Sequence, residues 1–166
     1  MTAKSDDRAQ FSELMEAYAA PVRRLCAAYA VSGADREELV QDIFLAVWRA
    51  LPGFRGESSV RTWLYRIAHN VALTWQTRDR RRLAREAPFD DDVDDVAVAA
   101  HVVDLRRLAL KRAIAGMNAA DRTLTLLWLE GLSAAEIEDV TGIKSATVAV
   151  RLGRIRKQLM PIEALP

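Results

Sequence analysis

Apolar residues along this 166-residue chain recur at three- and four-residue spacings, which is the period of an amphipathic helix. Residues 9–31 carry one such stripe, and Pro21 within it favours a kink or a first-turn position there. Residues 32–51 carry a second stripe, which opens on cap-type and acidic residues and is stopped by a Pro-Gly pair. No segment shows strand-like alternation of useful length. The N-terminal part of the chain is therefore predicted to be helical.

A third helix is predicted over about residues 59–82, and a helical wheel separates a core face from a wet face. The core face would hold Val60, Trp63, Leu64, Ile67, Val71 and Trp75. The wet face would carry two neighbouring rows, Arg61, Tyr65 and His69 beside Thr62, Arg66, Asn70 and Thr74. On this interpretation Trp63 is a core residue, and Tyr65 is the ring that a nucleic-acid base could stack on. The alternative is an ordinary solvated basic face.

The last third of the chain predicts two further helices up to Gly131, followed by a helix-turn-helix. Ser133 and Glu136 have the spacing of a capping box. Another helix is expected from near Ser145. Its buried stripe would comprise Val148, Leu152 and Ile155. Its exposed face is basic, since residues 144–158 contain five basic residues and no acidic one. This pattern fits a recognition helix for the major groove, and a basic amphipathic helix in a small bundle is the alternative.

Charged residues are unevenly distributed along the chain, although its formal net charge is only +1. Residues 61–86 hold seven basic residues against two acidic ones, whereas residues 87–104 hold six acidic residues and no basic one. An acidic stretch whose first half lacks an apolar stripe is typical of a linker. We therefore predict an all-α protein of two small helical domains, residues 1–86 and 105–166, joined by a flexible acidic linker over residues 87–104.

Composition argues against several classes of protein. No apolar run approaches the roughly 18 residues of a membrane span, and the N-terminus lacks the apolar region of a secretion signal. The single cysteine, Cys26, cannot form an internal disulfide, which favours a cytoplasmic location. Cys26, His69 and His101 do not form a metal or nucleophile arrangement, and the linker aspartates lack the glycine and glutamate of a calcium loop. Neither an enzyme nor a cofactor is expected.

Two long segments resemble the extracytoplasmic-function class of bacterial sigma factors. DREELVQDIFLAVWRALPGFRGESSVRTWLYRIAHN resembles region 2 of that family, and GLSAAEIEDVTGIKSATVAVRLGRIRKQL resembles its region 4. The likeness covers about residues 10–85 and 105–160, in the family's order. It implies a non-enzymatic subunit that brings core RNA polymerase to promoters and helps to open them. It also implies promoter DNA and an anti-sigma factor as further partners, with no membrane insertion of its own.

The resemblance assigns roles to residues of this chain. Residues 35–51 would dock on the β′ clamp helices of the polymerase, and the β flap is the other expected contact. The docking residues would be Gln41, Asp42, Leu45 and Trp48, although Trp48 could equally be a deep core residue. The −10 element would be bound and melted by Phe54, Ser58, Ser59, Arg61, Tyr65, Arg66, His69, Asn70 and Arg78. The −35 element would be bound by Lys144, Ser145, Thr147, Arg151, Arg154 and Lys157.

The sequence also departs from the family pattern. Ala149-Val150 stands where a Lys-Ser pair is common, which removes one expected phosphate contact. The main alternative function is a dimeric helix-turn-helix regulator that binds an operator without polymerase. That alternative leaves the polar face of residues 59–82 without a role. A helical adaptor protein that does not depend on DNA is a third class.

Overall fold

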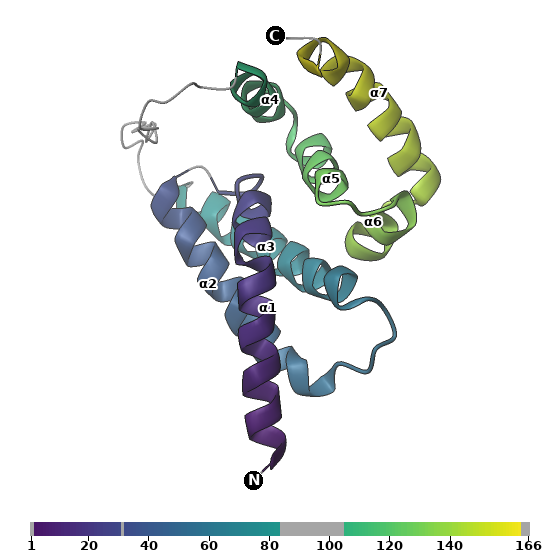
Figure 1. Ribbon diagram of the computed structural model, residues 1–166. Coiled ribbons are helices and arrows are strands. Elements are labelled where there is room, and N and C mark those ends of the chain that lie inside the picture. The colour runs from purple at the N-terminus through teal and green to yellow at the C-terminus, as the bar shows by residue number, and fades with distance from the viewer. Residues whose placement is uncertain (1, 31, 84–104, 164–166) are drawn as a thin grey trace. The chain divides into compact units, whose positions relative to one another are not determined.

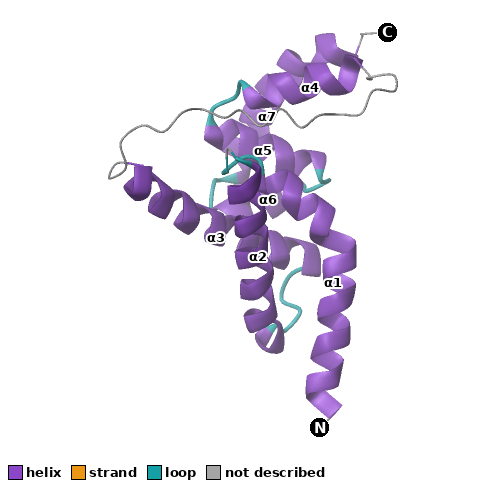
Figure 2. Ribbon diagram, turned by 90° about the vertical axis from the view of Figure 1, so that its left-hand side faces the viewer, coloured by secondary structure: helices purple, strands orange, loops and turns teal. Residues whose placement is uncertain are grey.

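The computed structural model describes residues 2–30, 32–83 and 105–163, and every regular element in these ranges is helical (Figures 1 and 2). The chain divides into two compact units, with the division after Val93. The predicted all-α fold with two helical domains is thereby confirmed. The acidic linker predicted over residues 87–104 lies outside the described residues, so its bounds stay a prediction.

The first unit is built around three helices and a short 3-10 turn. Its elements are α1 (Thr2–Cys26), α2 (Gly33–Ala50), η1 (Leu51–Gly53) and α3 (Val60–Leu83). Ser32 caps α2, because its Oγ accepts a hydrogen bond from the Asp35 N–H at 3.0 Å. The helices contact one another around a fully buried core that includes Val22, Leu39, Ile43, Val47 and Leu64. α1 does not end at Pro21, which lies inside the helix, and Val22 directly after it is buried in the core.

The buried face of α3 differs from the predicted one. Tyr65 is only 1% exposed and His69 is 9% exposed, whereas Trp63 is half-buried. The expectation that Tyr65 and His69 lie on the wet side of the helix is therefore wrong. The physical reason is that α3 contacts both α1 and α2, so a large part of its circumference is buried. Ala68 and Ala72 belong to this buried part. These small side chains let helices approach closely, and the wheel did not count them as core positions.

Tyr65 and His69, two of the buried side chains of α3, contact tyrosine side chains from the first 30 residues of the chain. The Tyr65 ring meets the Tyr18 ring edge-to-face, with 6.4 Å between the centroids. The hydroxyl oxygen of Tyr29 lies 2.6 Å from His69 Nδ1, and both side chains are buried. A buried polar group is costly without such a partner, so the pair between Tyr29 and His69 is part of the core of this unit.

The buried imidazole of His69 is expected to make the first unit sensitive to pH. Burial lowers the pKa of His69 below its ordinary value of 6.5, because the charged ring would lose its water. The unfolded chain therefore binds the proton more tightly. The stability that comes from the neutral ring is complete above the unfolded pKa of 6.5 and is lost as the pH falls from there toward the lower folded pKa.

We therefore expect the midpoint of urea unfolding to fall when the pH is lowered from about 7.5 to about 5. A His69→Gln variant should show a smaller fall, since its amide does not titrate. His101 is present in both proteins, so its titration cancels in the comparison. The same pH dependence in both proteins would contradict this expectation.

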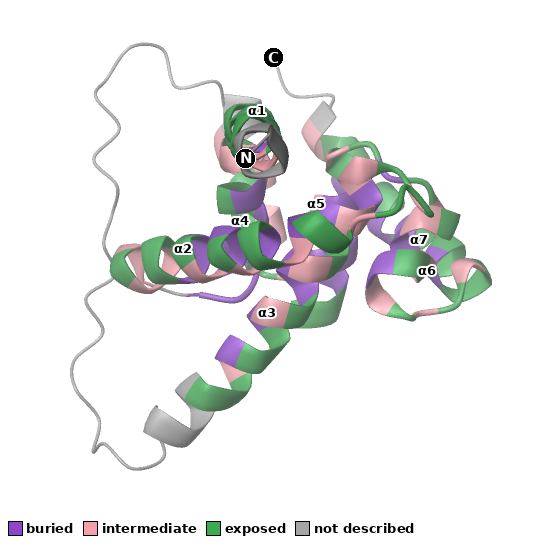
Figure 3. Ribbon diagram, turned by 90° about the horizontal axis from the view of Figure 1, so that it is seen from below, coloured by how far each residue is buried: buried purple, intermediate pink, exposed green. Residues whose placement is uncertain are grey.

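The second unit carries the helix-turn-helix. Its described elements are α4 (Leu105–Ala115), α5 (Ala119–Leu129), α6 (Ala134–Thr141) and α7 (Ser145–Glu163). The predicted capping box is confirmed, since Ser133 Oγ accepts from the Glu136 N–H at 3.2 Å and Glu136 Oε2 accepts from the Ser133 N–H at 2.8 Å. α6 ends at Gly142, whose φ of 74° is a conformation that glycine favours. The predicted stripe of α7 is also buried, which gives the alternation of buried and exposed segments seen in Figure 3.

Candidate nucleic-acid interface

The turn between α6 and α7 is held by Glu138. Its Oε2 accepts a hydrogen bond from the Ser145 N–H at 2.8 Å, and its Oε1 pairs with Lys144 Nζ at 3.2 Å. The hydrogen bond from Ser145, followed by the contact with Lys144, lowers the pKa of the Glu138 carboxyl. Two predicted DNA contacts, Lys144 and Ser145, therefore also start the recognition helix. The Lys144 side chain remains 83% exposed.

One face of α7 is exposed and lies opposite its buried stripe. Its projecting side chains follow one another at three- and four-residue spacings and are Thr147, Val150, Arg154 and Lys157. We call these four residues the α7 row. Three of the predicted −35 contacts therefore lie on one exposed surface, and Val150 is a fourth member that the resemblance did not assign.

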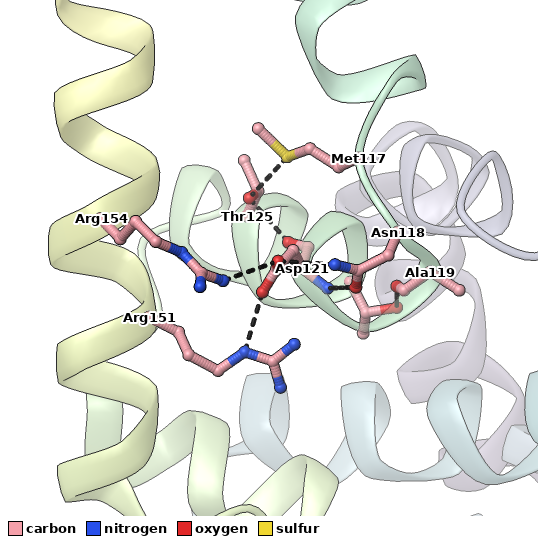
Figure 4. A network of polar contacts seen from close by, with 8 residues as sticks. Met117, Asn118, Ala119, Asp121, Thr125, Arg151 and Arg154 are labelled. Carbon is pink, nitrogen blue, oxygen red and sulfur yellow. Dashed lines mark hydrogen bonds and ion pairs between the residues drawn. The ribbon is translucent and has the colours of Figure 1, made fainter.

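Arg151 and Arg154 are both held by a buried carboxylate that the sequence analysis missed (Figure 4). Asp121 Oδ1 accepts from Arg151 Nε at 2.8 Å, and Asp121 Oδ2 accepts from Arg154 Nη2 at 3.1 Å. Asn118, which caps α5, donates from Nδ2 to Asp121 Oδ2 at 2.7 Å and accepts from the Asp121 N–H at 2.9 Å. Thr125 donates to the Asp121 carbonyl at 2.7 Å. The N-terminus of α5 is thus joined to the middle of α7.

The Asp121 contacts differ in exposure, which separates the roles of the two arginines. The Asp121 side chain is 9% exposed, that of Arg151 is 27% exposed and that of Arg154 is 61% exposed. Burial acts to raise the pKa of Asp121, but the hydrogen bond from Asn118 and the two guanidinium groups outweigh it, so the pKa lies below its ordinary value. Arg151 therefore mainly links α7 to Asp121 inside the domain, whereas most of the Arg154 side chain is exposed to solvent.

In the first unit, the loop before α3 places an aromatic pair at the surface. The rings of Phe54 and Trp63 lie with their centroids 4.8 Å apart and their planes at 43°, and both residues are half-buried. We call them the ring pair. Ser59, a predicted −10 contact, caps α3, since its Oγ accepts from the Thr62 N–H at 3.1 Å. The partly exposed aromatic residues beside this loop are therefore Phe54 and Trp63, whereas Tyr65 is buried.

The remaining predicted −10 residues divide by exposure. Arg66, Asn70 and Arg78 are exposed on α3, whereas Ser58 and Arg61 are half-buried. The structure therefore leaves a polar surface along α3, next in sequence to the ring pair. Side chains of the arginines after Arg78 lie outside the described residues.

α2 exposes two large apolar side chains among the predicted docking residues. Leu45 is 47% exposed and Trp48 is 39% exposed, so Trp48 is not a deep core residue. Trp48 is steadied by Phe11 of α1, at 5.1 Å between ring centroids in an edge-to-face arrangement. Gln41 is exposed beside them and Asp42 is half-buried. Together Leu45 and Trp48 form an apolar surface, which we call the α2 patch.

Comparison with known proteins identifies the family. Residues 14–96 match the family Sigma-70 region 2, and residues 107–159 match the family Sigma-70, region 4. The ECF RNA polymerase sigma-E factor of Haemophilus influenzae is 31% identical over 92% of this chain and 87% of its own length. The chain belongs to the extracytoplasmic-function class of the sigma-70 family. It is a sigma factor, a subunit with which core RNA polymerase starts transcription at promoters, and the dimeric-regulator alternative is set aside.

Other relatives agree with this sigma factor family. The ECF RNA polymerase sigma factor SigG of Mycobacterium tuberculosis is 33% identical over 93% of this chain, which spans 49% of that protein's length. The sigma factor RpoE of Bartonella quintana, solved in complex with the anti-sigma factor NepR, has the same fold. Its TM-score is 0.74 at 22% identity, over 94% of this chain and 98% of that one.

The described residues of this sigma factor show little sign of other kinds of site. Among the described residues, no group of three or more His, Cys, Asp or Glu side chains is placed to hold a metal ion. Within the same ranges, no helix is both long enough and apolar enough to cross a membrane. Burial raises the pKa of Cys26 to about 12, so its thiol is an inert part of the core.

Proposed function

We propose that this sigma factor directs core RNA polymerase to promoters by binding the −35 element through α7 and the melted −10 element through the ring pair and α3. The observation that carries the proposal is that both sigma regions of one chain present an exposed surface suited to DNA. The protein would act in the cytoplasm without enzymatic activity of its own. An anti-sigma factor is an expected partner, as for the solved relative.

The proposed −35 surface is the exposed face of α7. Lys144, Arg154 and Lys157 would contact phosphates or guanine edges, and Thr147 would reach a base or its methyl group. Ser145 would contribute through the start of the helix, where its N–H is already bonded to Glu138. Arg151 would act mainly by keeping α7 in place.

The proposed −10 surface combines stacking and charge. The half-buried Trp63, whose ring lies against that of Phe54, would offer a π-face on which an unpaired base can stack. Arg66, Asn70 and Arg78 would follow the backbone of the separated strand along the exposed side of α3. Ser58, Ser59 and Arg61 would shape the loop and the start of the helix.

The α2 patch is the proposed polymerase-docking surface, and Leu45 offers the cleanest test. We expect Leu45→Lys to weaken binding to core RNA polymerase about tenfold, because a buried interface would have to desolvate an unpaired charge. Leu73→Lys is the matched control, since Leu73 on α3 is 45% exposed, nearly as much as Leu45, and should leave binding unchanged without DNA. Equal losses in both variants would contradict the assignment.

The proposed function as a whole is tested by transcription. The full-length protein with core polymerase should start transcripts from a subset of a genomic promoter library, and core polymerase alone should not. Gel filtration and pull-down with core polymerase complete the test. A self-sufficient dimer that binds DNA and ignores the polymerase would overturn the proposal.

A further inference from the structure

Val150 is the most exposed large apolar side chain in the described ranges, at 75%. It lies in the middle of the α7 row, on the opposite side of the helix from the buried residues Val148 and Leu152. The core of the domain is complete without it. A single exposed apolar side chain is common on protein surfaces, so exposure alone does not make Val150 a contact; its position within the basic α7 row is what points to one.

The surroundings of Val150 favour a polyanion over an apolar protein surface. Residues 144–158 carry five basic side chains and no acidic one, and Thr147 and Arg154 flank Val150 along the α7 row. A protein partner that covered Val150 would have to accept this dense positive charge. Double-stranded DNA matches it, because every nucleotide supplies a phosphate.

Small residues beside the α7 row let a groove wall come close. Ala146, Ala149 and Gly153 are exposed on the flanks of the row. A Cβ added at Gly153 would meet nothing within 4 Å, and Ala149 and Gly153 line a hollow together with Trp128, so no side chain fills the space over this flank of the helix. On such a surface a short side chain such as Val150 can still reach the base edges of the major groove.

We propose that Val150 contacts the C5-methyl group of a thymine in the −35 element, and that it thereby selects thymine at one promoter position. The thymine methyl is the apolar feature that a major groove displays among hydrogen-bonding edges. The inference rests on the proposed −35 role of α7.

The test uses full-length protein in holoenzyme with core polymerase and a duplex library whose −35 region is randomised. Wild-type holoenzyme should enrich thymine at one −35 position. Val150→Ala should lower the preference for that thymine about fourfold, the effect expected for losing apolar contact with about one buried methylene or methyl group. Met160→Ala is the matched control, because Met160 is also on α7 and 62% exposed, and its motif should be unchanged.

A single enriched duplex then isolates the methyl group. Replacing the selected thymine by deoxyuridine removes only the methyl, and it should weaken wild-type binding about fourfold but leave Val150→Ala binding unchanged. A motif with no such thymine, or equal deoxyuridine losses in both proteins, would overturn this inference alone. If wild-type holoenzyme enriches no −35 sequence at all, both the Val150 inference and the proposed −35 role of α7 are overturned.

Discussion

Trp63→Ala should reduce promoter opening about tenfold while leaving the first, closed complex with duplex DNA nearly unchanged. Stacking of one base on an aromatic ring contributes about 1–3 kcal/mol, and this contact exists only after a base has left the duplex. The partly exposed Trp63, whose ring is tilted against that of Phe54, is the proposed stacking surface. Permanganate reactivity of unpaired thymines would measure opening, and gel shift at low temperature would measure the closed complex.

A pre-melted promoter bubble and a control variant make the Trp63 result decisive. Trp63→Ala holoenzyme should bind the bubble more weakly than wild type, because the unpaired base loses its stacking partner. Tyr65→Phe is the control, since Tyr65 is buried and keeps its ring in this variant, and opening should change little. A loss on closed duplex as large as the loss on the bubble would show that Trp63 supports the fold and not the melted strand.

Arg151→Ala should destabilise the second unit by about 2–3 kcal/mol, because breaking a largely buried ion pair leaves the remaining charge poorly compensated. The Asp121 carboxylate, 9% exposed, would lose the partner of its Oδ1. Arg154→Ala should cost less than about 1 kcal/mol, as an exposed ion pair contributes little. Hydrogen exchange of the α5 and α7 amides in full-length protein would report the stability of this unit by itself.

Comparing these variants separates the structural role of Arg151 from the proposed DNA contact of Arg154. Asp121→Ala combined with Arg151→Ala should cost less than the sum of the two single changes, because no unpaired buried charge is left. Arg154→Ala should weaken −35 binding with a shallower dependence on salt while the fold stays intact. Similar hydrogen exchange in Arg151→Ala and Arg154→Ala would contradict the division of roles drawn from their exposures.

Most of the helical framework could be predicted because its signals are local. The capping box of Ser133 and Glu136 and the stop at the Pro-Gly pair act within a few residues, so they can be recognised in the chain itself. The Asp121 network could not be predicted in this way. Asp121 lies thirty residues before Arg151 in the sequence, and nothing in either local pattern indicates that folding brings them to 2.8 Å.

The sequence by itself determined the helices, the helix-turn-helix and the basic face of α7, because capping, periodicity and charge are properties of short segments. Membership of the sigma-70 family also came from the sequence, through its likeness to known members. Only the tertiary structure decided which aromatic ring faces out. Within SSVRTWLYRIAHN, residues 60–70 fold as part of α3, but the rotation of this helix depends on close packing with α1 and α2 around Ala68 and Ala72. That packing buries Tyr65 and His69 and leaves Trp63 partly exposed, because the core takes the helix face that lets neighbouring helices approach most closely.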